Sequence, residues 1–411
     1  KIAAYVKNEV SPKTIGITGS SGKTTVKEML AAILSRLGNV LATKGNFNND
    51  IGVPLTLLRI EKSHDFAVIE MGANHIGEIA YTVDLVRPDV AMINNIAAAH
   101  LEGFGDLCGV ARAKGEIFSS LSSDGVALYN RDTRYTSKWQ WRLTDKKVRT
   151  FSCDNTKNID KAGNADCFSE NVLLDDNGCA TFNLVSSLGK CTINLPIPGK
   201  HNVCNAVAAA SAAIECGATL NDIQLGLAEM APVKGRLNIH KLPATALSSE
   251  IRLIDDSYNA NVESIKAAIS LLASYQGQRI LVLGDMAELG SDARSYHQEV
   301  GEYAKEQGIN VLLTLGVLSQ NTSDAFAHKN EAISEHFSDK QVLNDYLFNL
   351  LVNQKNTAAT MSQEQHILVK GSRSAHMEYV VEDLINWHTQ QQQESQLLNS
   401  NEVSKNKQDT A

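Results

Sequence analysis

The sequence predicts an α/β protein with two domains, and three observations lead to this prediction. Short apolar runs alternate with segments of helical periodicity from about residue 13 onward. Several of these runs are apolar throughout, as in the strands of a parallel sheet that helices cover on both faces. The chain has 411 residues, which is more than a single hydrophobic core usually supports.

The first domain is expected to span residues 1–238. Its helices are predicted at 26–38, which ends in Gly38, and at the alanine-rich segment 202–217. Residues 150–195 contain Gly, Asn and Asp turns between short strands, so we expect an antiparallel extension of the same sheet there. The buried parallel strands are predicted at 14–18, 66–70, 90–96 and 126–130.

The second domain is expected to span residues 239–388, where a new series of strands and helices begins. It is the smaller of the two, and the regular alternation predicts a Rossmann-like α/β domain. Residues 389–411 are polar and of low complexity, which predicts a disordered tail. The strands of the second series are predicted at 251–257, 279–286, 311–316 and 366–372.

Composition and charge exclude several classes of protein. The net charge of −8 argues against a general nucleic-acid-binding protein, although a local basic pocket for phosphates is compatible with it. No run of about 18 apolar residues is present, so we expect no membrane span. The opening residues contain no apolar core of a signal peptide. Seven cysteines without metal-site spacing predict free thiols, and therefore a cytoplasmic protein.

The stretch GITGSSGKTT (16–25) stands between a predicted strand and a predicted helix, where a phosphate-binding loop belongs. It is not the common Walker pattern, because position 17 is Ile17 where that pattern has glycine. In a phosphate loop, Lys23 would supply positive charge to the phosphates and Thr24 would place its hydroxyl on a magnesium ion. The alternative is a glycine-rich turn followed by an incidental Lys-Thr pair.

Two further polar residues follow predicted parallel strands. Glu70 closes the strand 66–70, and His100 follows the strand 90–96 after a short loop. Both should lie at the carboxyl edge of the sheet, beside the phosphate loop. A carboxylate there is a natural ligand for magnesium. The alternatives are a helix N-cap for Glu70 and a surface loop residue for His100.

At this point the sequence resembles the Mur ligase superfamily, whose phosphate loop has the pattern T-G-[ST]-x-G-K-[ST]-[ST]. Further stretches are similar to the superfamily members that add D-alanyl-D-alanine, and SYNAN and GDMAELG are the most specific of them. The resemblance covers residues from about 12 to 385, but not the N-terminal domain that grips the uridine nucleotide in that family. The stretches that carry it are TKGNFNNDIGVP (43–54), IEMGANHIGEI (69–79), NNIAAAHLEGFG (94–105), ARAKGEIF (111–118), PGKHNVCNAVAA (198–209), PVKGRL (232–237), DDSYNAN (255–261), LGDMAELG (283–290) and KGSRSAHME (370–378).

The resemblance implies a fold and a function. The first domain would be a P-loop-type ATPase domain, and the enzyme an ATP-dependent carbon–nitrogen ligase that forms ADP and phosphate. It would join D-alanyl-D-alanine to the tripeptide carboxylate of UDP-N-acetylmuramoyl-tripeptide through an acyl phosphate. This step belongs to cytoplasmic peptidoglycan synthesis, and so to cell-wall formation, cell shape and division. We expect a monomer that uses ATP and Mg²⁺, with two metal sites and a carbamate on Lys114.

The resemblance also implies roles for individual residues. Lys23, Lys114 and His100 would be catalytic, and Thr24, Glu70, His100 and Lys114 would hold metal. ATP would be bound by Gly19, Ser20, Ser21, Gly22, Lys23, Thr24, Thr25, Asn202, Asn205, Arg236, Asp256, Tyr258 and Asn259. The acceptor and amine substrates would be bound by Asn48, Asn49, Asp50, Lys370, Ser372 and Arg373.

Other interpretations stay open from the sequence alone. Lys114 could be an unmodified cation, Asn205 a helix cap and Arg373 a solvated surface charge. A ligase of the same superfamily could take another amine, and a nucleotide-binding module without catalysis is a third possibility. The presence of Lys23, Glu70 and Lys114 argues against the last one. The sequence does not distinguish a tripeptide ending in lysine from one ending in diaminopimelate.

Overall fold

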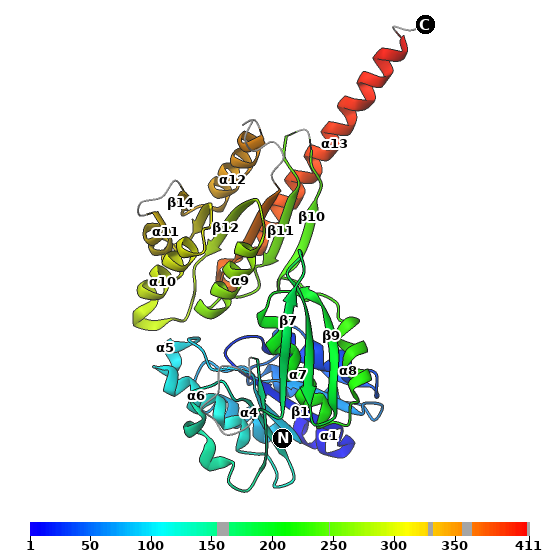
Figure 1. Ribbon diagram of the computed structural model, residues 1–411. Helices are drawn as coiled ribbons and strands as arrows, with labels where there is room; N and C mark the ends of the chain where they lie inside the picture. The colour runs from blue at the N-terminus through cyan, green and yellow to red at the C-terminus, as the bar shows by residue number, and fades with distance from the viewer. Residues whose placement is uncertain (154–163, 246, 328–331, 356–363, 409–411) are drawn as a thin grey trace. The chain divides into compact units, whose positions relative to one another are not determined.

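The computed structural model describes residues 1–153, 164–245, 247–327, 332–355 and 364–408 (Figure 1). Its contacts divide the chain into two compact units. Unit 1 contains Lys1–Val233 together with Glu288–Ser291, and unit 2 contains the rest. Arg236 therefore lies in unit 2, although the boundary expected at residue 238 would place it in the first domain. That expected boundary stays a prediction for the functional domains.

Unit 1 is built on a nine-stranded sheet among the described residues, with the order β2-β3-β1-β4-β5-β6-β7-β8-β9. Strands β2 to β7 pair in parallel, while β7, β8 and β9 pair antiparallel, as expected for the extension near residues 150–195. The strands are β1 (Lys13–Thr18), β2 (Val40–Ala42), β3 (Phe66–Glu70), β4 (Val90–Ile93), β5 (Val126–Asn130), β6 (Lys147–Ser152), β7 (Cys167–Leu174), β8 (Cys179–Ser186) and β9 (Gly189–Pro198).

The helices of unit 1 bury one apolar face against this sheet. Met29, Leu30 and Ile33 of α2 are fully buried in the same core as Ile15 of β1 and Val207 of α7. The helices are α1 (Ile2–Val10), α2 (Lys23–Leu34), α3 (Gly52–Leu57), α4 (Glu78–Val86), α5 (Leu101–Phe104), α6 (Leu107–Gly115), α7 (His201–Ile214) and α8 (Leu220–Ala228), with short 3₁₀ turns η1 (Glu116–Phe118), η2 (Thr136–Lys138) and η3 (Gln140–Arg142).

The cysteines differ in part from the sequence prediction. Cys153, after β6, is bonded to Cys204 of α7, with their Cα atoms 4.8 Å apart. The prediction of free thiols is therefore wrong for these two, because the fold joins residues 51 apart in the sequence, which spacing does not reveal. The free cysteines are Cys108, Cys167, Cys179, Cys191 and Cys216.

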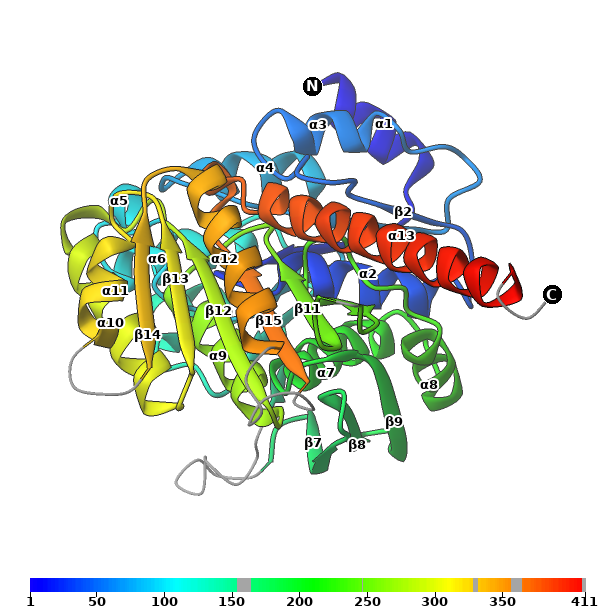
Figure 2. The same cartoon turned by 90° about the horizontal axis from the view of Figure 1, so that it is seen from above.

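Unit 2 is built on a six-stranded sheet among the described residues, with the order β10-β11-β15-β12-β13-β14. Strand β10 pairs antiparallel with β11, and the others pair in parallel. Figure 2 shows β15 between β11 and β12, although it is the latest of the six in the chain. The strands are β10 (Asn238–Leu242), β11 (Ile251–Asp256), β12 (Gln278–Gly284), β13 (Val311–Leu315), β14 (Ile333–Phe337) and β15 (Gln365–Lys370).

The helices of unit 2 enclose a second core. Leu343, Leu347 and Leu351 of α12 are fully buried in it together with Val282 of β12. Helix α13 includes much of the segment 389–411, whose predicted disorder stays a prediction. The helices are α9 (Val262–Ser274), α10 (Ala293–Glu306), α11 (Gln320–Ala327), α12 (Lys340–Lys355) and α13 (Glu378–Gln408), with 3₁₀ turns η5 (Gly290–Asp292) and η6 (Arg373–Ala375).

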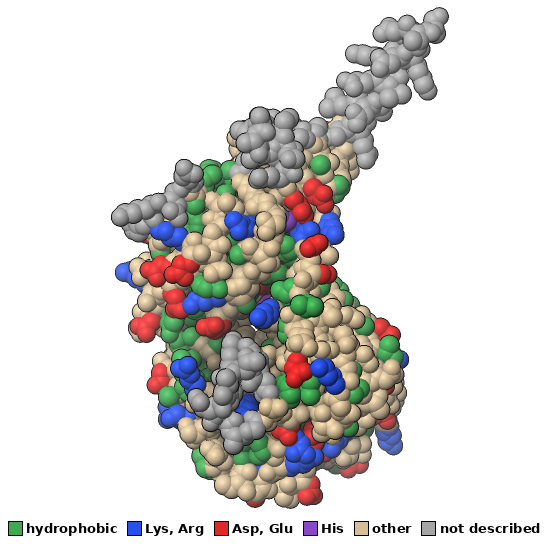
Figure 3. Space-filling model, viewed as in Figure 1, with side chains coloured by type: hydrophobic (Ala, Val, Ile, Leu, Met, Phe, Trp, Pro, Cys, Tyr) green, Lys and Arg blue, Asp and Glu red, His purple; other side chains and the backbone are tan. Residues whose placement is uncertain are grey.

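The surface and the helices bear on the classes of protein considered above. On the face seen in Figure 3, basic and acidic side chains are interspersed, and neither sign gathers into one field. Within the described ranges, no helix has both the length and the apolar character that crossing a membrane requires.

Candidate nucleotide and metal site

The phosphate loop lies where the sequence predicts it, between β1 and α2. Gly22 precedes the first helical residue with φ of 73°, a left-handed conformation that favours glycine. A Cβ atom at Gly22 would lie 2.4 Å from Asn205 Oδ1, so glycine is also required by space. Lys23 donates from Nζ to the carbonyl of Gly19 at 2.7 Å, folding back over the loop. A helix N-terminus that opens from such a turn is an anion-binding arrangement.

Two asparagines at the carboxyl end of β4 hold this loop. Asn95 Oδ1 accepts hydrogen bonds from the backbone N–H groups of Ser20 (3.1 Å) and Ser21 (2.9 Å). Asn94 Nδ2 donates to the Ser21 carbonyl at 3.0 Å and to Asn205 Oδ1 at 3.2 Å. Sequence reasoning gave neither residue a role. The available signal was the abrupt change from an apolar strand to two amides at its end.

Glu70 joins three elements at the end of β3. The residue is 1% exposed, and its Oε2 accepts a hydrogen bond from the Thr24 hydroxyl at 2.9 Å. Its Oε1 accepts one from Asn48 Nδ2 at 2.8 Å, and its backbone N–H donates to the Thr43 hydroxyl at 3.0 Å. The alternative of a helix N-cap does not hold, because Gly77 occupies that position of α4. A buried carboxylate beside a hydroxyl is a suitable donor set for a hard cation.

Lys114 of α6 is buried to the same degree as Glu70, at 1% exposed. Within the described part of the chain, its Nζ has no hydrogen-bond partner, and it lies 5.2 Å from the centre of the Phe104 ring. Burial lowers the pKa of Lys114 to about 7, and the positive charge of Lys23 contributes to the same shift. The amine is therefore substantially uncharged at neutral pH.

His100 has a backbone φ of 54° and precedes α5. Its Nδ1 contacts the carboxylate of Glu288, a residue that groups with unit 1. The hydrogen bond from His100 lowers the pKa of Glu288. His100 is thus not an unattached surface residue.

The two asparagines of α7 are both buried. Asn205 Nδ2 donates to Asn202 Oδ1 at 2.9 Å, and Asn202 Nδ2 donates to the Pro198 carbonyl at 2.6 Å. Asn205 lies within the helix, not at its cap, which is Lys200. Its contact with Asn94 places it against the phosphate loop.

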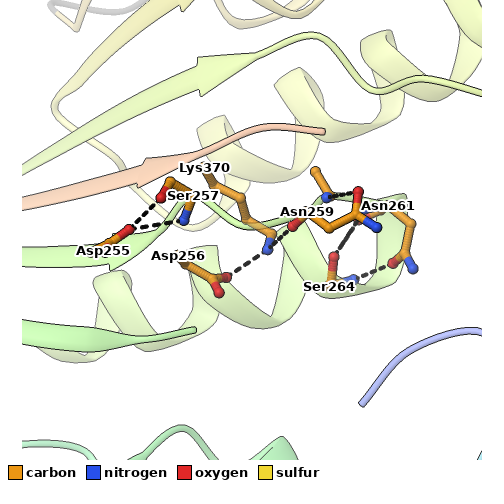
Figure 4. A network of polar contacts seen from close by, with 8 residues as sticks. Asp255, Asp256, Ser257, Asn259, Asn261, Ser264 and Lys370 are labelled. Atoms are coloured by element: carbon orange, nitrogen blue, oxygen red, sulfur yellow. Dashed lines mark hydrogen bonds and ion pairs between the residues drawn. The ribbon is translucent and has the colours of Figure 1, made fainter. Parts of the chain in front are cut away.

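Unit 2 gathers a second set of the predicted residues, of which Asp256, Asn259 and Lys370 are labelled in Figure 4. Lys370 Nζ donates to Asp256 Oδ2 at 2.6 Å and to the Asn259 carbonyl at 2.8 Å. The aromatic ring of Tyr258 lies 4.6 Å from the Arg236 guanidinium and 5.7 Å from that of Arg373. All of them but Arg236, which precedes β10, come from the carboxyl ends of β11 and β15 or the segments that follow, the usual place for a site in a parallel sheet.

The predicted substrate residues differ in how they are held. Asn48 bonds Glu70, and the Asn49 side chain accepts from the Gly52 N–H at 2.7 Å while Asp50 is exposed. Ser372 is buried and donates to the Asp285 carbonyl at 2.6 Å. Arg373 is largely exposed and pairs with Glu378 at 2.9 Å.

Comparisons with known proteins identify the family of the chain. The family model for the Mur ligase middle domain matches residues 17–213, and the one described as "Mur ligase, glutamate ligase domain" matches residues 235–373. The chain therefore belongs to the Mur ligase family, a family of ATP-dependent acid–amino acid ligases.

Within that family, the chain is similar to enzymes named UDP-N-acetylmuramoyl-tripeptide–D-alanyl-D-alanine ligase. One from Escherichia coli (strain K12) is 48% identical over 93% of this chain and 79% of its own length. One from Bacillus subtilis (strain 168) is 35% identical over 93% of this chain and 78% of its own length. A crystal structure of MurF from Acinetobacter baumannii superposes with a TM-score of 0.83 at 36% identity, covering 93% of this chain and 79% of that one.

Proposed function

We propose that this chain joins D-alanyl-D-alanine to the tripeptide carboxylate of UDP-N-acetylmuramoyl-tripeptide, forming ADP and phosphate from ATP, in the cytoplasm. One observation carries the proposal. The phosphate loop, Glu70 and Asn48 form one hydrogen-bonded group in a chain that is 48% identical to a ligase of that name. The residues proposed for the phosphates, for magnesium and for the acceptor (the loop 43–54, here called the acceptor loop) would thus meet at Glu70.

Residues that would bind ATP are proposed in each unit. The N-terminus of α2 and Lys23 would hold the phosphates, while Asn202 and Asn205 would lie toward the adenine. In unit 2, Arg236 would neutralise phosphate charge, Asp256 would accept from the ribose hydroxyls, and Tyr258 and Asn259 would flank the nucleotide. A MurF ligase from Thermotoga maritima whose structure was solved in complex with ADP shares the fold at 24% identity, with a TM-score of 0.78.

The residues present fit magnesium. Thr24 and Glu70 offer oxygen donors, and His100 and Lys114 would complete a second site. When bound, magnesium would offset phosphate charge and polarise the phosphoryl group that is transferred. A plain ammonium at Lys114 would repel the cation, and it has no lone pair to donate. A carbamate, formed when CO₂ adds to the neutral amine with loss of a proton, has the charge and oxygen atoms required. The burial of Lys114 and its lowered pKa, which makes the neutral amine available, support this proposal.

The chain's own residues would then position and protect the reaction. A carboxylate is a poor acylating agent, so ATP first phosphorylates it, and the dipeptide amine attacks the acyl phosphate and releases phosphate. Lys23 and Arg236 would orient the phosphoryl group and balance its charge. The loop carrying Asn48, Asn49 and Asp50 would face the tripeptide, and Ser372 and Arg373 would bind a substrate carboxylate.

Phosphate release from ATP tests this function directly. We expect release only when a UDP-N-acetylmuramoyl-tripeptide and D-alanyl-D-alanine are both present, and we expect a product of the summed mass. Single amino acids, tested as the amine, separate this ligase from others of the family. Lysine- and diaminopimelate-ending tripeptides should be compared side by side. Equal turnover with an unrelated amine, or ATP binding without any turnover, would contradict the proposal.

A further inference from the structure

Lys370 lies against Asp256, the residue proposed above to accept hydrogen bonds from the ribose hydroxyls of ATP. It is 2% exposed, and its ammonium group donates to the Asp256 carboxylate and to the Asn259 carbonyl. We propose that Lys370 is a positioning residue that sets the Asp256 carboxylate for the ribose hydroxyls of ATP. The proposal rests on the ribose role of Asp256 given above, and it replaces the acceptor role expected for Lys370 from the sequence.

The register of the sheet explains why these two residues meet. Strands β11 and β15 pair in parallel, and Asp256 lies directly opposite Lys370 at their carboxyl ends. Side chains opposite each other on neighbouring strands point to the same face of a sheet. The longer lysine side chain reaches past the carboxylate to Asn259, as Figure 4 shows.

Lys370 supports the middle of a loop whose ends are fixed by other bonds. At one end, Ser257 donates to Asp255 Oδ1 from its hydroxyl at 2.5 Å and from its N–H at 3.1 Å. At the other end, Asn261 and Ser264 form the capping box of α9. Between these two ends, the Lys370 ammonium group bonds both the Asp256 carboxylate and the backbone carbonyl of Asn259, and so ties the carboxylate to the loop (Figure 4).

The charges argue against a role in binding the acceptor. The Lys370 side chain is only 3% exposed, so a substrate carboxylate would have to displace Asp256 from it. Separating a buried ammonium from its carboxylate is strongly unfavourable. Because the ammonium bonds Oδ2, Oδ1 is the oxygen of Asp256 that a ribose hydroxyl would approach. Arg373, which is 56% exposed, is better placed for an incoming anion.

The test compares the affinities of ATP and 2′,3′-dideoxy-ATP by calorimetry on the full chain. The wild type is expected to prefer ATP, and Lys370→Met to lose about tenfold in ATP affinity while dideoxy-ATP affinity changes little. In Lys370→Met, the ratio of the ATP affinity to the dideoxy-ATP affinity therefore falls toward one. The KM for the tripeptide nucleotide stays unchanged. Asp256→Asn should show the same loss of ATP affinity. The double variant, Lys370→Met with Asp256→Asn, should lose no more ATP affinity than either single variant. Lys241→Met, an exposed lysine of β10, is the matched control.

Each other outcome has a defined meaning. The inference is overturned if Lys370→Met weakens the binding of ATP and of dideoxy-ATP equally. It is also overturned if Lys370→Met raises only the KM for the tripeptide nucleotide. If the wild type and Asp256→Asn bind both nucleotides alike, the ribose role of Asp256 fails first. Should Lys370→Met not fold, Lys370→Gln removes the charge with a smaller loss of hydrogen bonding, and the same loss of preference is expected.

Discussion

At the scale of single residues, Lys114 shows how burial changes what a side chain can do. An uncharged amine reacts with CO₂, whereas an ammonium does not, and burial holds the pKa of Lys114 at about 7. We predict that Lys114→Ala lowers the ligation rate by about two orders of magnitude or more. Acetate at high concentration should restore part of that rate if the natural group is a carbamate, as measured by phosphate release.

The control for this prediction is Lys190→Ala, an exposed lysine of β9 that should keep full activity without acetate. A bare amine at Lys114 in the mass spectrum of active, metal-loaded enzyme, together with no rescue by acetate, would return Lys114 to the role of a simple cation.

His297 of α10 gives a prediction about pH and stability. Its Nε2 accepts from the Met286 N–H at 3.0 Å and its Nδ1 donates to the Ala293 carbonyl at 2.7 Å, so the folded protein needs the neutral ring. Burial lowers the pKa of His297 below the usual 6.5. Below pH 6.5 the unfolded chain therefore binds a proton that the folded one does not. The unfolding free energy should fall as the pH drops from 6.5 through the lowered pKa.

Urea unfolding at several pH values between 5 and 8 measures this effect. The contribution of His297 can reach about 1.4 kcal/mol per pH unit, and His297→Gln should reduce the slope. His376→Gln, a histidine with a side chain 53% exposed, should leave the slope as in the wild type. Identical slopes for all three proteins would show that His297 is not responsible.

At the scale of elements, Lys27 connects the phosphate-loop helix with the acceptor loop. This residue of α2 is 1% exposed and donates from Nζ to the Thr43 carbonyl at 2.6 Å. The Thr43 hydroxyl in turn accepts from the Glu70 N–H. We predict that Lys27→Met raises the magnesium concentration needed for half-maximal rate and lowers stability by about 1–3 kcal/mol. Titration of magnesium at saturating ATP, with urea unfolding, provides both measurements.

Lys13→Met, an exposed lysine at the start of β1, serves as the comparison for Lys27→Met. If Lys27→Met lowers stability but leaves the magnesium requirement unchanged, Lys27 only fills and fixes the core, and its link to Glu70 has no functional effect.

The elements also show how far the sequence could predict the fold. The strands at 66–70 and 126–130 were predicted with their observed bounds, because each begins with a run of apolar residues that are buried in the structure and ends at a single polar residue. Strand β14, which reads ISEHF, had no such signal because it is half-buried and polar. Its place at the edge of the second sheet is decided by pairing with β13, which local sequence does not encode.

The candidate site was predictable to the extent that its chemistry lies in local motifs. The phosphate loop follows β1 directly and Glu70 is the last residue of β3, so the sequence could place both at the ends of strands, and the family resemblance then gave them their expected roles. The positions of Asn95 and Lys370 could not be predicted in the same way. Their partners lie 75 and 114 residues away, and only the strand register brings them together.

At the scale of the whole molecule, each unit has its own hydrophobic core. Leu30 is fully buried in the core of unit 1, and Leu347 in that of unit 2. Truncating a buried leucine to alanine costs about 2–5 kcal/mol. We predict two calorimetric transitions, with Leu30→Ala lowering the temperature of one and Leu347→Ala that of the other. A single transition that both variants shift alike would mean that the cores unfold together.

The place of β15 in the second sheet has a consequence for how the protein is made. Strands β11 and β12 leave the ribosome early, yet neither is the other's neighbour, because β15 lies between them. Until Lys370 has been synthesised, both present unpaired backbone groups along the edge that β15 will occupy. Such edges pair readily with other chains. The second domain therefore completes its sheet only when translation has reached β15, and the nascent chain has to be kept from its neighbours throughout that interval.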